Sequence, residues 1–152
     1  MVFREIAFGT DEYRRECELR NAVLREPLGL SLTAEELARE ADQLHFGLFE
    51  PDGKLVGCVV AVRLSPTEAR IRQMAVSPSQ QRRGLGTRIL DELEADLRSR
   101  GFTRFVLHAR ASAVRFYERL GYTAVGEAFV DVGVPHFRMV KAVVDAPRLA
   151  RH

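Results

Sequence analysis

The chain has 152 residues, of which 46% are hydrophobic and 29% are charged, and its formal net charge is only +2. This length supports one domain with a single substantial core, and this composition argues against a disordered chain. The small net charge argues against nucleic-acid binding by the whole surface. No apolar run reaches membrane-spanning length and the N-terminus carries no signal-peptide pattern, so we expect a cytoplasmic protein without a membrane partner.

The N-terminal half predicts one strand, two helices and then a three-stranded meander. Thr10 can cap the first helix, which Pro27 and Gly29 end, and Thr33-Ala34-Glu35-Glu36 has the capping-box pattern of a second, short helix. Glu50-Pro51-Asp52-Gly53 predicts a tight turn within the meander. The expected strands are 3–8, 45–49, 55–64 and 68–76, and the first helix is expected at about 11–26.

The C-terminal half predicts a strand–helix–strand crossover, a further helix and a closing hairpin. Leucine and isoleucine recur at spacing four from Leu85 to Leu97, which is typical of a helix packed on a sheet. The expected helices are 84–100 and 112–120, and the expected strands are 102–109, 122–130 and 137–143, with a turn at Gly133-Val134-Pro135. We find no interdomain linker, so residues 1–144 are expected to form one domain and 145–152 a loose tail.

The two cysteines, Cys17 and Cys58, lie far apart and match no metal-ligand or redox spacing. They therefore predict two small buried side chains in a reducing compartment. No metal site and no covalent enzyme intermediate are expected from them.

The run from Gln81 to Thr87 joins a predicted strand to a predicted helix and contains two glycines. Backbone N–H groups at a helix start favour an anion, and Arg82 and Arg83 add positive charge. A Walker A loop is excluded because no lysine follows Gly86, and the dinucleotide fingerprint is excluded because Ile89 stands where it needs a third glycine. The sequence therefore predicts a site for a phosphorylated ligand of another class.

The pattern Gln81-x-x-Gly84-x-Gly86, followed downstream by Phe116-Tyr117-x-x-Leu120-Gly121-Tyr122, resembles the GNAT N-acetyltransferase superfamily. The resemblance implies an α/β (α+β) fold, with a mixed twisted sheet of about six to seven strands flanked by about four helices. It also implies an N-acetyltransferase that transfers an acetyl group from acetyl-CoA to a primary amine by direct attack in a ternary complex.

The resemblance assigns donor binding to two segments. The backbone of Met74, Ala75 and Val76 would align the pantetheine arm, and the loop would hold the pyrophosphate through Gln81, Arg82, Arg83, Gly84, Leu85, Gly86 and Thr87. Phe116 would lie beside the cofactor. The family often carries asparagine where this chain has Arg110, so the usual asparagine contact is not assumed: Arg110 is a candidate donor to pantetheine or phosphate, and the alternative is an exposed side chain.

Tyr117 is the candidate general acid, because a phenol is protonated near neutral pH and can donate to a leaving thiolate. The base is open among Glu68, His45, His108, His136 and water. The stretch from Gly126 to His136 resembles the ElaA-like branch of the family, which implies an acceptor pocket lined by His45, Glu127, Asp131 and His136.

Two other interpretations remain open at this point. A CoA-binding sensor or partner-binding module would carry the same loop without turnover, and a nucleic-acid-binding domain would use Arg82 and Arg83. The acceptor, a small molecule or a peptide amine, cannot be named from the sequence, because a fold does not determine a substrate. The closing hairpin offers an edge for a homodimer.

Overall fold

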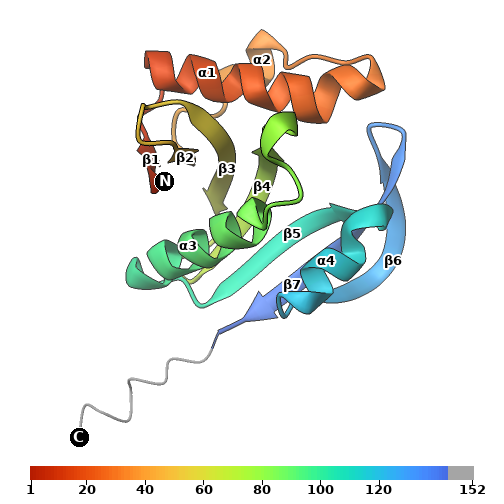
Figure 1. Ribbon diagram of the computed structural model, residues 1–152. Coiled ribbons are helices and arrows are strands. Elements are labelled where there is room, and N and C mark those ends of the chain that lie inside the picture. Colours follow the sequence, from red (N-terminus) through yellow and green to blue (C-terminus); the bar gives the residue numbers. More distant parts are fainter. Residues whose placement is uncertain (144–152) are drawn as a thin grey trace, which may run out of the picture. The chain divides into compact units, whose positions relative to one another are not determined.

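The computed structural model describes residues 1–143, which contain seven β-strands and four α-helices. The strands are β1 (Val2–Ile6), β2 (Leu44–Phe49), β3 (Leu55–Arg63), β4 (Glu68–Val76), β5 (Arg104–Arg110), β6 (Thr123–Asp131) and β7 (Val134–Ala142). The α-helices are α1 (Asp11–Arg20), α2 (Ala34–Ala38), α3 (Leu85–Ser99) and α4 (Val114–Arg119) (Figure 1). The expected α/β class and the expected numbers of strands and helices are confirmed.

The chain forms two compact units. The first unit consists of Met1–Val62 and Ile71–Ala95, and the second consists of Arg63–Arg70 and the described residues that follow Ala95. A single domain over residues 1–144 stays a prediction. The expected loose tail at 145–152 lies outside the described residues.

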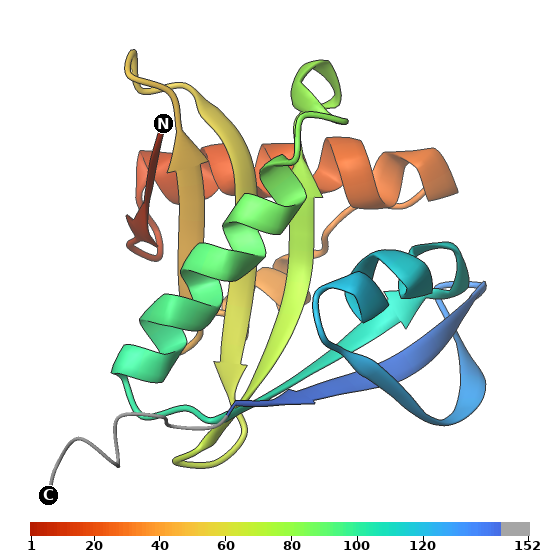
Figure 2. The same cartoon turned by 60° about the horizontal axis from the view of Figure 1, so that its bottom comes forward.

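In the first unit the strands follow the order β1-β2-β3-β4. β2 pairs antiparallel with both β1 and β3. α1 and α2 cover one face of these strands, and α3 covers the other (Figures 1 and 2). The α3 helix approaches β3 closely at Gly57, where an added Cβ would lie 2.5 Å from Cδ1 of Ile89. Glycine at this position therefore lets the start of α3 pack directly on the strand.

The first two helices begin where the capping residues predict. The Oγ1 atom of Thr10 accepts a hydrogen bond from the N–H of Tyr13 at 3.2 Å, and Thr33 and Glu36 form the reciprocal capping box. The first helix is α-helical only to Arg20, then continues as a π-helical turn at Asn21–Arg25 and a 3₁₀ turn at Glu26–Leu28. Pro27 lacks an N–H for the helical ladder, which explains why the last turns depart from α geometry.

In the second unit the strand order is β5-β7-β6, and both pairings are antiparallel. Figure 2 shows α4 lying across these strands. The predicted hairpin turn at Gly133–Pro135 is wrong, because the observed turn begins one residue earlier and ends two residues earlier. The turn lies at Val132 and Gly133, whose φ angles are 47° and 74°, and Pro135 belongs to β7 opposite Val130. A two-residue turn that matches strand twist needs positive φ at both central residues, which decides this position.

Cys17 and Cys58 are both free and buried, as predicted. Burial raises the pKa of each thiol, which keeps both protonated. Within the described part of the chain, no helix combines the length and apolar character that crossing a lipid bilayer requires.

Candidate active site

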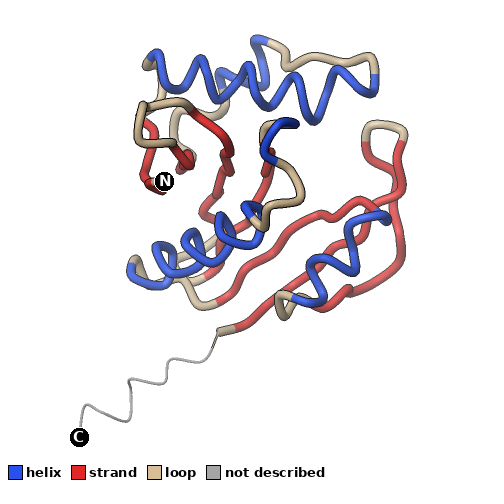
Figure 3. The backbone as a smooth tube through the Cα atoms, viewed as in Figure 1, coloured by secondary structure: helices blue, strands red, loops and turns tan. Residues whose placement is uncertain are grey.

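A short loop connects the end of β4 to the start of α3 (Figure 3). Arg82 has φ 67° and Gly84 has φ 75°, so two left-handed residues alternate with others in this short segment. Such alternation turns successive N–H groups into an anion-binding concavity. The carbonyl of Gly84 accepts the first helical hydrogen bond, from Arg88 at 3.1 Å. The N–H groups of the first turn of α3 therefore precede the helical ladder and can bind an anion.

Side chains of the loop tie it to the end of β4. Gln81 donates from Nε2 to the carbonyl of Val76 at 3.0 Å, and Arg83 donates to Oε1 of Gln80 at 2.7 Å. Arg82 and Gly84 are exposed. Gln81 is therefore a loop anchor in this structure, while the exposed backbone between Arg82 and Gly84 remains the part that a ligand can reach.

The three residues assigned to the pantetheine arm form the end of β4. Ala75 is buried, and Met74 and Val76 are half-buried. Directly before them, Gln73 has a φ of 57°, which breaks the extended conformation inside the strand. Sequence reasoning missed this residue, since a glutamine in a β-rich run carries no signal of positive φ.

Tyr117 lies in the middle of α4. Its ring contacts Phe116 at a centroid distance of 5.0 Å and Tyr122 at 5.9 Å, both edge to face. The helix ends just after Tyr117, because the N–H of Tyr122 bonds the carbonyl of Tyr117 at 3.1 Å and Gly121 adopts a φ of 96°. Burial raises the pKa of the Tyr117 phenol to about 12. The phenol therefore stays protonated across the physiological pH range.

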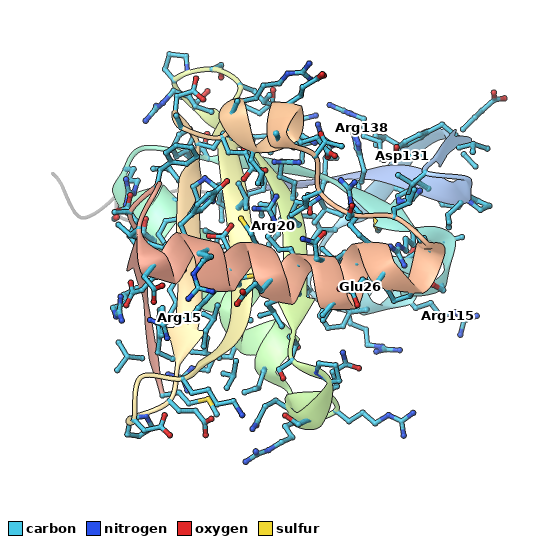
Figure 4. The ribbon with its side chains drawn as sticks, turned by 90° about the horizontal axis from the view of Figure 1, so that it is seen from above. Arg15, Arg20, Glu26, Arg115, Asp131 and Arg138 are labelled. Carbon is cyan, nitrogen blue, oxygen red and sulfur yellow. The ribbon has the colours of Figure 1, made fainter. Side chains whose placement is uncertain are left out.

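The register of the second unit places two of the four predicted acceptor-pocket residues, Asp131 and His136, on one face of its strands. Arg110 pairs with His136, and His136 pairs in turn with Phe129. Residues directly opposite in a ladder share a face, and so do residues two apart along a strand. Asp131, two residues after Phe129, therefore lies on this face too and is exposed. Figure 4 labels Asp131 on β6 and Arg138 on β7. Glu127 falls in the irregular stretch of β6 between Val125 and Phe129.

The hydrogen bond that the His136 ring makes determines which of its two nitrogens can accept a proton. Its Nδ1 lies 2.8 Å from the carbonyl oxygen of Val134, and that oxygen can only accept, so Nδ1 carries the proton. A neutral His136 therefore has an unprotonated Nε2. His136 as a whole is 6% exposed, and its ring stacks on the ring of Phe129 at a centroid distance of 5.9 Å.

The other candidate bases are engaged elsewhere. His108 accepts at Nδ1 from Arg70 at 3.0 Å, and burial together with that charge lowers the pKa of His108. Glu68 accepts from Nε of Arg104 at 2.7 Å. His45 is 1% exposed, with Nδ1 2.9 Å from Oε2 of Glu16 and Nε2 3.0 Å from the carbonyl of Glu40. This geometry favours a structural role for His45 over a place in the acceptor pocket.

His45 belongs to a buried polar cluster that sequence reasoning largely missed. Glu16, Arg20 and Glu40 are each at most 1% exposed. One signal was available: Tyr13, Glu16, Cys17 and Arg20 recur at helical spacing, which places the two charged residues on the buried stripe of α1.

Comparisons with known proteins agree with the fold. Residues 20–143 match the profile of the family described as "Acetyltransferase (GNAT) domain". A Bacillus subtilis (strain 168) protein, presumed to be an acetyltransferase, is 33% identical over 128 residues, which cover 82% of this chain and 85% of that protein.

Two solved structures share the fold at low sequence identity. The crystal structure of an aminoglycoside 6'-N-acetyltransferase complexed with coenzyme A has a TM-score of 0.78 at 20% identity, covering 97% of this chain and 99% of that one. The crystal structure of Escherichia coli ElaA has a TM-score of 0.77 at 19% identity, covering 93% of this chain and 99% of that one.

Proposed function

Since the chain belongs to the GNAT acetyltransferase family, we propose that it transfers the acetyl group of acetyl-CoA to a primary amine. The observation that carries the proposal is the loop at the start of α3, where Arg82 and Gly84 both have a left-handed φ, a pattern that can form an anion-binding concavity. A pyrophosphate has the charge and the several oxygen acceptors that such a concavity binds. The likeness to an enzyme crystallised with coenzyme A supports this choice of ligand.

Donor binding is assigned to the first unit. The N–H groups between Arg82 and Thr87 would bind the pyrophosphate, and the positive charges of Arg82 and Arg83 would add to them. The backbone of Met74, Ala75 and Val76 would align the pantetheine arm as an added strand. One of these N–H groups would bind the thioester oxygen as it gains charge.

Proton transfers are assigned to the second unit. The amine nitrogen attacks the thioester carbon, the C–S bond breaks, and coenzyme A leaves as a thiolate. Before the attack, Nε2 of His136 would take a proton from the ammonium form of the acceptor, directly or through water, which leaves the neutral amine as the nucleophile, and Tyr117 would hydrogen-bond the departing sulfur. Arg110 and Phe116 would line the donor, and the exposed carboxylates of Glu127 and Asp131 would attract a cationic acceptor.

A panel of amines incubated with acetyl-CoA tests the proposal, with release of free thiol as the readout. The panel should contain a polyamine, an aminoglycoside, amino acids and a lysine peptide, because the acceptor class is open. We expect thiol release with at least one amine and acetyl-CoA binding by calorimetry. Binding without turnover on any amine would indicate a CoA sensor, and absence of binding would refute the proposal. A homodimer through the β6 edge stays a prediction.

A further inference from the structure

Gln73 interrupts β4 one residue before the segment that we assign to the thioester. Its φ of 57° lies in the left-handed region, which a glutamine rarely occupies. Such a conformation persists only where surrounding groups determine it, and it recurs next to active sites. The contacts of Gln73 and of its neighbour Arg72 therefore show what holds β4 in this shape.

Arg72 and Gln73 are consecutive in β4, yet both side chains contact the same buried cluster. Nη1 of Arg72 donates to Oε2 of Glu40 at 3.1 Å, and Oε1 of Gln73 lies 3.4 Å from Nε of Arg20. In a regular strand, successive side chains point to opposite faces. The left-handed turn at Gln73 allows both contacts at once, and both contacts in turn resist a return to an extended strand.

Arg20 is itself held rigidly on α1 (Figure 4). It is fully buried, and it donates from Nη1 to Glu16 and Glu40 at 2.8 Å each and from Nη2 to Glu40 at 2.5 Å. Tyr13 donates to the same Glu40 carboxylate at 2.7 Å. The terminal nitrogens of the guanidinium are thus fixed by two carboxylates, which aims the remaining Nε at Gln73.

A metal site is the competing interpretation of this cluster, since ligand atoms of Glu16, Glu40 and His45 lie within 4.8 Å of one another. The positive guanidinium of Arg20 already occupies the carboxylates that a cation would need. Both nitrogens of His45 face atoms that only accept hydrogen bonds, so both carry protons and neither can ligate a metal. The cluster is therefore better explained by what Arg20 holds.

We propose that Arg20 is a positioning residue for acetyl transfer, which acts by keeping Gln73 left-handed so that the backbone N–H groups of Met74–Val76 face the thioester. This inference rests on the proposed function, because it assumes that these groups bind the donor. Arginine is required because one rigid fork must bind two carboxylates and Gln73 together, which the single ammonium group of a lysine cannot do.

Substitutions at Gln73 separate conformation from packing. Gln73→Leu keeps the side-chain size but removes the acceptor for Arg20, so we expect kcat to fall roughly 10- to 100-fold, the loss that small misplacements of reacting groups produce. The KM for acetyl-CoA should change less than kcat does, because the pyrophosphate loop is untouched. Gln73→Gly also loses the contact but accepts positive φ without strain, so its kcat should stay near that of the wild-type protein.

The rescue experiment tests Arg20 directly. Arg20→Lys should lower kcat as Gln73→Leu does, and the double variant Arg20→Lys/Gln73→Gly should recover most of that loss, since glycine needs no support. Arg14→Lys is the matched control, because Arg14 lies on the exposed side of the same helix and pairs only with Asp11 and Glu18 among the described residues. Its kcat should be unchanged.

If Arg20 acts only in folding, Gln73→Gly will not restore the kcat of Arg20→Lys. A double variant that folds but shows no such recovery would overturn the proposal. So would equal losses in Gln73→Gly and Gln73→Leu. Amide chemical shifts of Met74–Val76, recorded with and without acetyl-CoA, provide a readout that needs no acceptor amine. If the wild-type protein shows no turnover, the proposed function fails. The positioning role is tested separately by the amide signals: Gln73→Leu should displace them and Gln73→Gly should not.

Discussion

Tyr117 illustrates how burial sets the chemistry of a single residue. Its pKa of about 12 lies above that of an ordinary phenol, because the charged form would be poorly solvated inside the helix packing. Full proton transfer from such a phenol to a thiolate, whose conjugate acid has a pKa of about 8.5, would be uphill by roughly 5 kcal/mol. A hydrogen bond to the developing thiolate is therefore the role that its energetics favour, and solvent would complete the protonation.

Replacing Tyr117 by phenylalanine keeps the ring and removes only the hydroxyl group. We expect kcat to fall about 100-fold, because the leaving sulfur loses its donor, while the Kd for acetyl-CoA stays the same. Steady-state kinetics and calorimetry measure the two quantities. The raised pKa also means that Tyr117 does not ionise below about pH 11, so any alkaline decline of kcat should persist unchanged in the variant. An equal loss of binding would show that the hydroxyl group is structural.

His136 is the residue for which hydrogen bonding determines the available nitrogen. Because Nδ1 donates to the carbonyl of Val134, Nε2 is the atom left to accept a proton. His136→Gln should lower kcat/KM for the amine by roughly 100-fold, because the proton acceptor is lost. His108→Gln is the comparison, since its Nδ1 already binds Arg70, and its kcat/KM should stay near that of the wild-type protein. An unchanged kcat/KM in His136→Gln would assign the base to water.

The loop before α3 acts as an element whose shape depends on one glycine. Gly84 has φ 75° with open space around it, so an added methyl group would meet no atom and would act only by opposing the left-handed backbone. Alanine in this region costs about 1 kcal/mol, which predicts roughly fivefold weaker acetyl-CoA binding for Gly84→Ala. Gly53→Ala is a matched control, since Gly53 also has positive φ and open space but lies in the β2–β3 turn. It should lose stability without losing affinity.

The α1 cluster should make stability depend on pH. Burial acts to lower the pKa of His45, but its hydrogen bond and charge interaction with Glu16 outweigh burial and raise it above the ordinary 6.5. A raised pKa in the folded state contributes stability below about pH 6.5, and this contribution is lost as the pH rises through the folded value. Urea unfolding should therefore show a lower free energy of unfolding at pH 8.5 than at pH 6.

The same cluster limits stability at the acid end. Burial alone would raise the pKa of Glu40, but hydrogen bonds and charge from Arg20 outweigh it and lower the pKa to about 2, against an ordinary 4.5. The contribution of Glu40 is present above about pH 4.5 and is lost as the pH falls towards 2. His45→Gln should flatten the curve above pH 6 and leave the acid decline intact. A curve unchanged by this substitution would place the titrating group elsewhere.

At the scale of the whole molecule, the two units divide the proposed work. The first carries the donor loop and the end of β4, and the second carries Tyr117 and His136. If the donor binds only the folded protein, acetyl-CoA at 100 times its Kd should stabilise the fold by about 2.7 kcal/mol, which raises Tm by roughly 5–10 °C. Thermal unfolding with and without acetyl-CoA measures this shift. Gly84→Ala at the same acetyl-CoA concentration should show a smaller one.

Much of this protein could be predicted from the order of its residues, because local preferences and short motifs act over a few positions. The caps at Thr10 and Thr33 and the strand at Glu68–Val76 are such features. The glycine loop and the Phe116-Tyr117 pattern likewise sufficed to indicate the family, since backbone conformation at those positions depends on glycine itself.

Only the tertiary structure decided how distant side chains combine. Gln73 has a positive φ and contacts Arg20, 53 positions away in the sequence, and no local pattern encodes that contact. The structural role of His45 likewise depended on Glu16, which faces Nδ1 of its ring from 29 positions away in the sequence. Long-range contacts of this kind set conformation and protonation, whereas the sequence alone specified which residues were available for them.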